Sequence, residues 1–298
     1  MGGIIAVIFD FDDTLMPDST TQLLRQRGID GARFWQDAAE RVKAGYDETL
    51  SWLNLFLELI GAGKPLGMLT NHELGAVGAT LEHQFFPGIP RLFTDLRKIA
   101  EKGKDVSIEF YIISGGLKPI LEATKVVTRY FSGVYASELG DDGKGGVLTH
   151  IKRAVTFTEK TRYLFEINKG VNAVKGANGV PEPQLVNKDV PIPQRRVPIK
   201  NMIYVGDGLT DIPCFSVVGK GIAADREPGT VFGIYDPKRE ETAKRAYREF
   251  LKARRVDGIY SAKYGPSADL GQLLRLAVGT LAGRLRIGPM EVHSAETR

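Results

Sequence analysis

The hydrophobic pattern of the chain alternates between short apolar runs and longer amphipathic stretches. The first run, Ile4 to Phe9, is unbroken and stops at three carboxylates, Asp10, Asp12 and Asp13. Short runs rich in β-branched residues indicate strands buried on both faces, as in the middle of a parallel sheet. Further strands are predicted at 106–113, 134–136, 202–205, 220–224 and 231–235. The pattern therefore predicts an α/β protein with a doubly wound parallel sheet.

Between the first strand and Phe86 the pattern is helical. Apolar residues recur at three- and four-residue spacing, which predicts helices at about 34–42, 50–60 and 71–83. A crossover between parallel strands needs only a short connection. We therefore expect residues 16–87 to form a separate helical cap, and residues 1–15 and 88–298 to form the core. The alternative is that these helices simply cover one face of the sheet.

Other helices are predicted after the second and later strands. The stretch DDGKGG at 141–146 predicts a hairpin tip, with a returning segment at 147–157. In the helix expected at 158–168, Leu164, Phe165 and Ile167 should face inward. Segment 170–201 contains five prolines and is predicted to be an irregular insertion within the core. The remaining helices are expected at 90–103, just after Ser114 to Gly116, from Asp236 onward, and at 267–285, followed by a frayed tail after Gly288.

Composition narrows the class of protein. The 298 residues are 43% hydrophobic and 26% charged, as in ordinary globular proteins. A net charge of +4 tolerates anionic small substrates, but it is not the concentrated basic signature of a nucleic-acid binder. The single cysteine, Cys214, excludes an internal disulfide and indicates a reducing compartment. The first apolar run is too short to span a membrane. We expect a soluble cytoplasmic protein without membrane or nucleic-acid partners, and its oligomeric state stays open.

Polar side chains follow three of the predicted strands. These are Asp10 and Asp12 after the first strand, Ser114 after the second, and Asp207 and Asp211 after the strand at 202–205. Because parallel strands end at one edge of a sheet, these residues should converge. Clustered carboxylates favour a hard cation such as Mg²⁺. One carboxylate can attack a phosphoryl group, and a second can transfer the proton.

A phosphoryl group also needs donors around its oxygens. The Ser114 hydroxyl, the backbone N–H groups of the Ser114-Gly115-Gly116 turn at a helix N-terminus, and one lysine would supply them. The sequence therefore predicts a phosphate site built from separate strand ends.

These residues carry a resemblance to the haloacid dehalogenase superfamily. The four motifs occur in order as Asp10-Phe-Asp12-Asp-Thr14, Ile112-Ile113-Ser114, a lysine before a helix, and Gly206-Asp207-Gly208-x-x-Asp211. The helical insertion after the first motif resembles the phosphoserine-phosphatase-like branch. The resemblance implies a Rossmann-like core with a mobile cap.

By this resemblance, Asp10 is the nucleophile and Asp12 is the general acid/base. Asp10, Asp207 and the backbone carbonyl of Asp12 would bind Mg²⁺, and Asp211 would either join the metal shell or orient it. Ser114 and Gly115 would hold the phosphoryl oxygens. Lys160 fits the family's lysine best, since Lys-Thr-Arg-Tyr-Leu resembles the lysine that opens a helix upstream of the fourth motif. Its rivals for this position are Lys118 and Lys169.

The resemblance also narrows the reaction. Family members with an acid two residues after the nucleophile act on phosphates, and Asp12 is such an acid. We expect a Mg²⁺-dependent phosphatase that hydrolyses a small phosphorylated metabolite through an aspartyl-phosphate intermediate. The alternatives are a phosphotransferase or mutase of the same fold, and a catalytically weak binding protein. Phosphoserine phosphatases have a substrate-binding glutamate shortly after the first motif, whereas this chain has Asp18 in that region.

Overall fold

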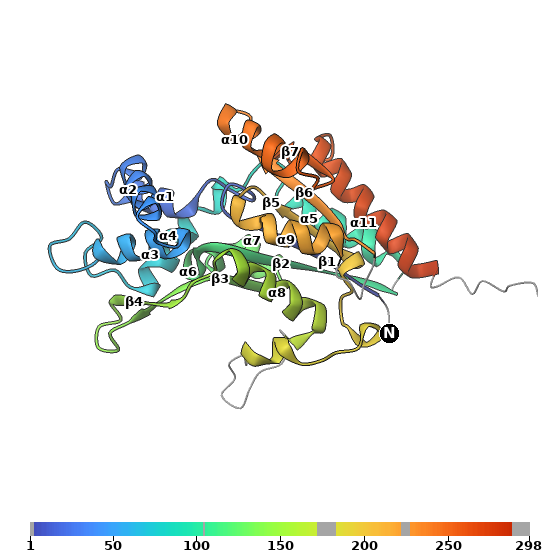
Figure 1. The fold of residues 1–298 in the computed structure, drawn as a ribbon, viewed down its shortest axis with the longest axis horizontal. Helices are drawn as coiled ribbons and strands as arrows, with labels where there is room; N and C mark the ends of the chain where they lie inside the picture. Colours follow the sequence, from blue (N-terminus) through green and yellow to red (C-terminus); the bar gives the residue numbers. More distant parts are fainter. Residues whose placement is uncertain (1–2, 104, 172–182, 222–226, 288–298) are drawn as a thin grey trace, which may run out of the picture.

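A seven-stranded sheet forms the centre of the molecule (Figure 1). The structure, a computed structural model, describes residues 3–103, 105–171, 183–221 and 227–287. The strand order is β4-β3-β2-β1-β5-β6-β7, and all neighbours are parallel except β3 and β4. The predicted α/β fold is therefore confirmed. The strands are β1 (Gly3–Phe9), β2 (Val106–Leu117), β3 (Gly133–Asp141), β4 (Leu148–Arg153), β5 (Met202–Gly206), β6 (Thr230–Tyr235) and β7 (Gly258–Ser261).

Strand β1 lies in the middle of the sheet and is buried on both faces. Ile5, Val7 and Phe9 belong to one hydrophobic core, and Ala6 and Ile8 belong to a second core on the opposite face. This explains why the first run of the sequence is continuously apolar instead of alternating. The site therefore begins on the most enclosed strand of the fold.

Helices cover both faces of the sheet. On one face, α5 (Arg91–Ala100) packs beside α11 (Asp269–Ile287). On the other face, α8 (Phe157–Lys169) packs beside α9 (Ile212–Lys220). Within the described residues, no helix is long and apolar enough to cross a membrane.

Four helices lie between β1 and α5 in the chain. In Figure 1 they occupy one end of the molecule, beside the β3–β4 hairpin. Helix α1 was not predicted, because it is short and has only one apolar pair; the Asp18 side chain caps it by accepting from the Thr21 N–H at 2.5 Å. The predicted helices at 34–42, 50–60 and 71–83 correspond to the other three. The four helices are α1 (Ser19–Gln26), α2 (Gly31–Lys43), α3 (Glu48–Glu58) and α4 (Asn71–Thr80).

The predicted turn at Ser114-Gly115-Gly116 is wrong. Strand β2 continues through these residues to Leu117, where it pairs with Ser137 of β3 after a register irregularity. Helix α6 (Lys118–Glu122) begins only afterwards and is followed by α7 (Lys125–Tyr130). Pairing with β3 extended the strand, and the glycines did not end it.

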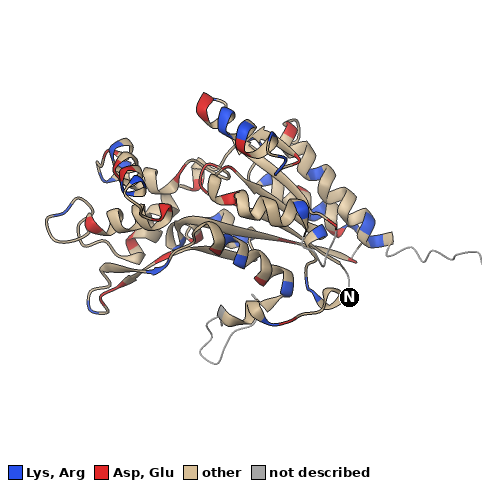
Figure 2. Ribbon diagram, in the orientation of Figure 1, with Lys and Arg blue, Asp and Glu red and all other residues tan. Residues whose placement is uncertain are grey.

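Three other expectations need correction. Phe165 is only half-buried, and Tyr163 takes an inward position beside Leu164. Asp236 does not open a helix, because its carboxylate accepts from the Lys238 N–H and from Arg239 in a turn. The helix that follows is α10 (Glu240–Arg245), continued by a π-helical turn at Ala246–Leu251. In Figure 2, basic and acidic residues alternate along this ribbon. Strand β7 is only four residues long and was not predicted.

Some predictions fall outside the described residues. The strand expected at 220–224 is one: Lys220 ends α9, and 222–224 are not described. The tail after Gly288 and part of the proline-rich segment, 172–182, are also outside. The remainder of that segment contains three short 3₁₀ helices, and Val197 and Ile199 are buried beside α8.

Candidate active site

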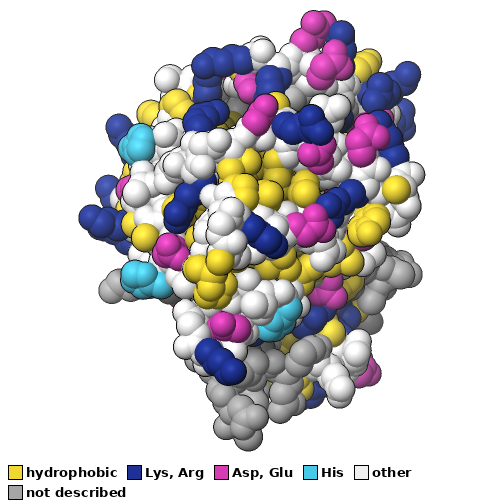
Figure 3. Space-filling view, turned by 90° about the vertical axis from the view of Figure 1, so that its left-hand side faces the viewer, with side chains coloured by type: hydrophobic (Ala, Val, Ile, Leu, Met, Phe, Trp, Pro, Cys, Tyr) yellow, Lys and Arg dark blue, Asp and Glu magenta, His cyan; other side chains and the backbone are white. Residues whose placement is uncertain are grey.

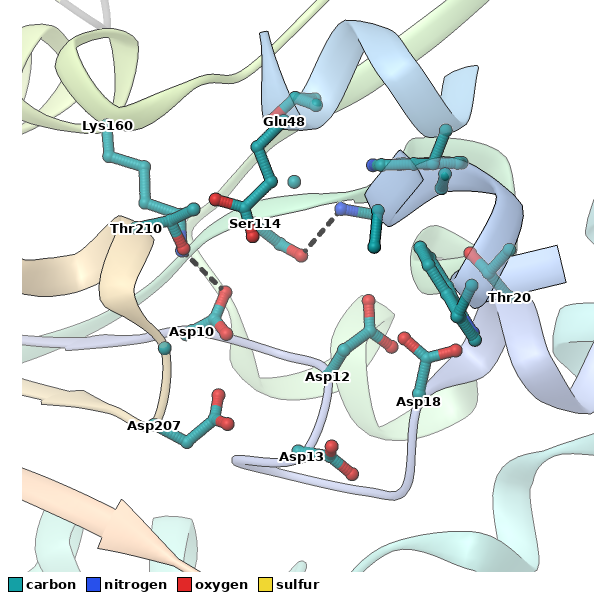
Figure 4. A pocket seen from close by; sticks show the side chains of 18 of the residues that line it. Asp10, Asp12, Asp13, Asp18, Thr20, Glu48, Ser114, Lys160, Asp207 and Thr210 are labelled. Atoms are coloured by element: carbon teal, nitrogen blue, oxygen red, sulfur yellow. Dashed lines mark hydrogen bonds and ion pairs between the residues drawn. The ribbon is translucent and has the colours of Figure 1, made fainter. Parts of the chain in front are cut away.

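A buried lysine joins two of the strand-end carboxylates. Lys160 Nζ donates to Asp10 Oδ1 at 3.0 Å (Figure 4). It also donates to Asp211 Oδ1 at 2.7 Å, and Lys160 is only 1% exposed. Lys160 lies in the first turn of α8, which packs against the 3₁₀ turn that contains Asp211. Burial opposes the charged form of Lys160, but the two carboxylates outweigh it and raise the pKa of Lys160. The ammonium is therefore a permanent positive charge in this site.

Asp211 has donors on both carboxylate oxygens. Tyr204 Oη donates to Oδ1 at 2.8 Å, in addition to Lys160, and the Gly208 N–H donates to Oδ2 at 2.9 Å. The residue is fully buried. Its side chain thus fixes both the lysine and the loop after β5.

Asp207 is held more loosely than Asp211. Its nearest side-chain donors, Thr14 Oγ1 and Arg245 Nη2, are each 3.5 Å from a carboxylate oxygen, and Arg245 also donates to its backbone oxygen at 3.1 Å. Burial raises the pKa of Asp207 well above its usual range, and Asp10 and Asp211 add to the effect. Within the described residues, Asp10, Asp207 and Asp211 each offer one oxygen, and these atoms lie within 4.8 Å of one another. This all-oxygen set fits a hard divalent cation.

Asp10 points toward Asp207 at the end of β1 (Figure 4). Its backbone N–H donates to the Val205 carbonyl at 2.8 Å, which fixes β1 against β5. Burial raises the pKa of Asp10 to about 7, although Lys160 acts in the opposite direction. A cation among these oxygens would favour the ionised carboxylate.

Asp12 lies apart from the three clustered carboxylates and close to Asp18 (Figure 4). Its Oδ1 accepts from the Ser19 N–H at 2.7 Å, at the start of α1. Its Oδ2 lies against Gly116, where an added Cβ would be only 2.4 Å away. Burial raises the pKa of Asp12 well above its usual range, and the charge of Asp18 adds to this. The environment therefore favours the protonated form of Asp12 over the carboxylate.

Ser114 is buried and also borders the site. Its Oγ accepts from the Gly116 N–H at 3.0 Å, so its hydroxyl proton can be donated elsewhere. Gly115 lies beside it along the same cavity. The predicted residues of the second motif thus meet those of the first, although they belong to a strand.

The assembled residues form one side of a cavity of about 500 Å³. The opposite side comes from α2 and α3, and this side was not predicted from the sequence. Figure 3 faces this end of the molecule and shows hydrophobic side chains grouped at its middle. The Glu48 side chain extends from α3 toward Ser114 (Figure 4). Burial raises the pKa of Glu48, and the charge of Asp47 adds to this shift. The residues of this side are Trp35, Ala38, Ala39, Val42, Glu48, Thr49 and Trp52.

The rival lysines lie elsewhere. Lys118 pairs with Glu122 at 3.7 Å and Glu138 at 3.9 Å, and Lys169 donates to the backbone oxygens of Val186 and Lys188. Among contacts that the sequence did not reveal, Arg245 reaches Asp207 from beyond the fourth motif. No spacing pattern links Arg245 to that motif, so only the fold could reveal this contact.

Comparisons with known proteins agree with the fold. No family model matches the chain. It is 31% identical over 290 residues to a protein of Borreliella burgdorferi that is described as uncharacterized, covering 90% of this chain and 94% of that protein. The two proteins belong to one family.

Solved structures identify the fold. A haloacid dehalogenase family hydrolase from Salmonella enterica serovar Typhi has a TM-score of 0.56 at 17% identity, over 90% of this chain and 69% of that one. A phosphoserine phosphatase, solved as a phospho-aspartyl intermediate analogue, has a TM-score of 0.52 at 14% identity, over 92% and 99%. Cytosolic 5′-nucleotidase IIIB bound to cytidine has a TM-score of 0.50 at 16% identity, over 94% and 87%. The chain has the haloacid dehalogenase fold in its phosphoserine-phosphatase-like form, as its motifs predicted.

Proposed function

We propose that this protein is a Mg²⁺-dependent phosphatase that hydrolyses a small phosphorylated metabolite in the cytoplasm. The observation that carries this proposal is the pairing of two carboxylates with different surroundings at the end of β1. Asp10 contacts the Lys160 ammonium at 3.0 Å, whereas Asp12 accepts the Ser19 N–H at 2.7 Å and lies near Asp18. The first environment supports an anionic nucleophile, and the second supports a proton donor.

In the first step, an Asp10 carboxylate oxygen attacks the phosphorus of the substrate. The bond between phosphorus and the leaving-group oxygen breaks, and Asp12 gives its proton to that oxygen. Lys160 and the Ser114 hydroxyl hold the oxygens of the phosphoryl group. The products of this step are an aspartyl-phosphate at Asp10 and the free alcohol.

In the second step, the Asp12 carboxylate takes a proton from water. The resulting hydroxide attacks phosphorus, and the bond to the Asp10 oxygen breaks. Phosphate leaves, Asp10 is again a carboxylate, and Asp12 is again protonated. Asp12 donates the proton in the first step and accepts a proton in the second. One acid with a raised pKa can therefore serve both steps.

Asp10 and Asp207 would hold Mg²⁺, with the backbone carbonyl of Asp12. The donor set fits, since Asp10, Asp207 and Asp211 offer oxygens within 4.8 Å of one another and the nearest side-chain donors of Asp207 are 3.5 Å away. When bound, the ion would neutralise charge on the phosphoryl oxygens. Asp211 already accepts three hydrogen bonds, from Lys160, Tyr204 and Gly208. We therefore assign it to orientation of the site instead of to the metal shell.

Residues 16–87 would act as a cap over this site. Their helices supply the apolar side of the cavity, so they would contact the leaving group. The phosphoserine phosphatase and the 5′-nucleotidase to which the fold is similar act on small phosphomonoesters, which supports a substrate of this size.

The test is phosphate release from p-nitrophenyl phosphate, with and without Mg²⁺. We expect activity that EDTA abolishes and Mg²⁺ restores, and its loss in Asp10→Asn. Asp37→Asn, an exposed acid paired with Arg33 on α2, is the charge-matched control and should retain activity. Full activity in Asp10→Asn would contradict the nucleophile assignment. Absence of turnover on a broad panel of phosphorylated metabolites would favour a binding protein, and transfer of phosphate to an added alcohol would favour a phosphotransferase.

A further inference from the structure

A second cavity, also of about 500 Å³, lies on the other side of the β1–α1 loop from the active site. Its lining comes from that loop, from α1, from residues 86–87, from the turn between β6 and α10, and from residues 261–263 at the end of β7. The two cavities share Asp13, Asp18 and Asp207. The second cavity is therefore a separate space that borders the first one across a single loop.

The acidic groups of this second cavity already have partners. Arg239 donates to Asp13 Oδ2 at 2.8 Å and to Asp236 Oδ2 at 2.9 Å. Asp18 accepts the Thr21 N–H at 2.5 Å as the cap of α1. Asp207 points toward Asp10 and the active site (Figure 4). Two of the four acids, Asp13 and Asp236, thus share Arg239, and Asp207 serves the active site.

Three cations of the same lining do not have such partners. Arg25, Lys238 and Lys263 come from α1, the β6–α10 turn and the segment after β7, and all three are exposed. Among the residues that the structure describes, none of the three forms an ion pair. The lining carries four acids and four cations, so its formal charge is balanced, and within the described part of the chain Arg25, Lys238 and Lys263 are the cations without an ion pair that could contact a bound anion.

The rest of the lining is mostly apolar. Phe86, Pro87, Pro17 and Tyr235 contribute flat, weakly hydrated surface. Pockets that combine such surface with a few charged groups suit small organic ligands better than simple ions.

We propose that this second cavity binds a small organic anion, with its carboxylate or phosphate at Arg25, Lys238 and Lys263 and its apolar body at Phe86 and Tyr235. Asp13 and Asp207 of the first and fourth motifs border this cavity, but no step of the proposed reaction takes place in it. The inference therefore stands apart from the proposed function.

A ligand bound in this cavity would affect the active-site loop through Arg239. Asp13 is a non-glycine residue at φ 54°, a left-handed conformation that is uncommon for such residues, and Arg239 is its partner. An anion that attracts Arg239 would compete with Asp13 for it. The loop that carries Asp10 and Asp12 is thus the element on which such a ligand acts.

The test is calorimetric binding of 2-naphthoate, a flat aromatic carboxylate, in the absence of Mg²⁺. We expect Lys238→Ala/Lys263→Ala to bind it about tenfold more weakly than the wild type, since each lost charge contact is worth up to about 1 kcal/mol at an exposed site. Lys102→Ala/Lys144→Ala, a control pair of lysines outside the lining, should bind it like the wild type. The uncharged 2-naphthamide should bind more weakly than 2-naphthoate. Competition by phenylphosphonate would assign the site to phosphates as well as carboxylates, and lack of competition would restrict it to carboxylates.

A second measurement locates the ligand in the wild-type protein without any variant. Lys238 and Lys263 should react more slowly with acetic anhydride when 2-naphthoate is present, while Lys144 should react at an unchanged rate. The proposal is overturned if 2-naphthoate does not bind, if the double variant binds it equally well, or if Trp52→Ala in the active-site cavity removes the binding instead. None of these readouts requires turnover, so failure of the proposed function would leave this test intact.

Discussion

The two sides of the active-site cavity are built in opposite ways. The side formed by the sheet consists of charged groups fixed by one another: Lys160 is 1% exposed and bridges Asp10 and Asp211. The side formed by α2 and α3 is apolar and more open, and Val42 at its rim is 39% exposed. The first side has the groups for phosphoryl chemistry, and the second has surface for a leaving group. The difference indicates that reaction and substrate preference are separable in this protein.

The largest effect is expected from the buried lysine. Lys160→Met would leave Asp10 and Asp211 without their shared cation in a buried place, and such losses cost about 3–5 kcal/mol. Chemical denaturation should show a loss of this size, along with loss of phosphatase activity. Lys169→Met, on the same helix but bound only to backbone oxygens, is the matched control. An equally stable Lys160→Met protein would show that the sheet side is not held together by this charge.

The next effect tests how closely Asp12 is positioned. Gly116→Ala would place a Cβ 2.4 Å from Asp12 Oδ2, so the carboxylate must move. Displacement of a catalytic group by about 1 Å can cost about 100-fold in rate, and we expect a fall in kcat of that order. Gly283→Ala, on α11 and outside the cavity, is the control, because its Cβ would meet nothing within 4 Å. Equal activity of the two variants would remove Asp12 from the proton-transfer role.

A smaller effect is expected on the apolar side. The rings of Trp52 and Trp35 pack with their centroids 5.9 Å apart. Trp35 Nε1 in turn donates to Thr21 Oγ1, which connects α2 to α1. Trp52→Ala should raise KM about tenfold for phosphate esters with bulky apolar leaving groups, since pocket contacts of this kind are worth about 1–3 kcal/mol. Activity on a compact ester should change much less. A uniform fall in kcat for both substrates would mean that the two sides are not separable.

The smallest effect is expected at an ion pair that lies outside both sides of the active-site cavity. Arg196, in the proline-rich segment, pairs with Glu109 on β2. Burial alone would raise the pKa of Glu109, but hydrogen bonds from Arg196 and Tyr111 outweigh it and lower the pKa. The pair therefore stabilises the fold at neutral pH, and this stability is lost as the pH falls below about 4.5 through the lowered pKa of the folded state.

Because the pair is partly exposed, Glu109→Gln should lower the free energy of unfolding at pH 7 by no more than about 1 kcal/mol. The difference between the variant and the wild type should shrink toward pH 3. A difference that grows with acid would have the wrong sign for this account. Activity at pH 7 should not change.

The sequence predicted the sheet side well and the apolar side poorly. Asp10, Asp207 and Asp211 follow buried strands, so parallel pairing alone brings them to one edge. Lys160 required the resemblance, because no pattern in a helix marks a lysine that turns into the core. Trp35, Glu48 and Trp52 lie on helices whose orientation depends on tertiary packing, and their spacing resembles that of ordinary core residues. Strand β7 was not predicted, because four residues are too few to show a periodic pattern. The end of β2 was misplaced, because glycines usually indicate a turn.

The central claim is that Asp10 is phosphorylated during turnover. The most direct measurement is a rapid acid quench of the enzyme with Mg²⁺ and an aryl phosphate, followed by peptide mapping by mass spectrometry. We expect a phosphoryl group on the peptide that contains Asp10, none in Asp10→Asn, and a longer-lived adduct in Asp12→Asn, where water is no longer activated. Turnover without a phosphorylated peptide, or with the phosphoryl group on another residue, would contradict the account.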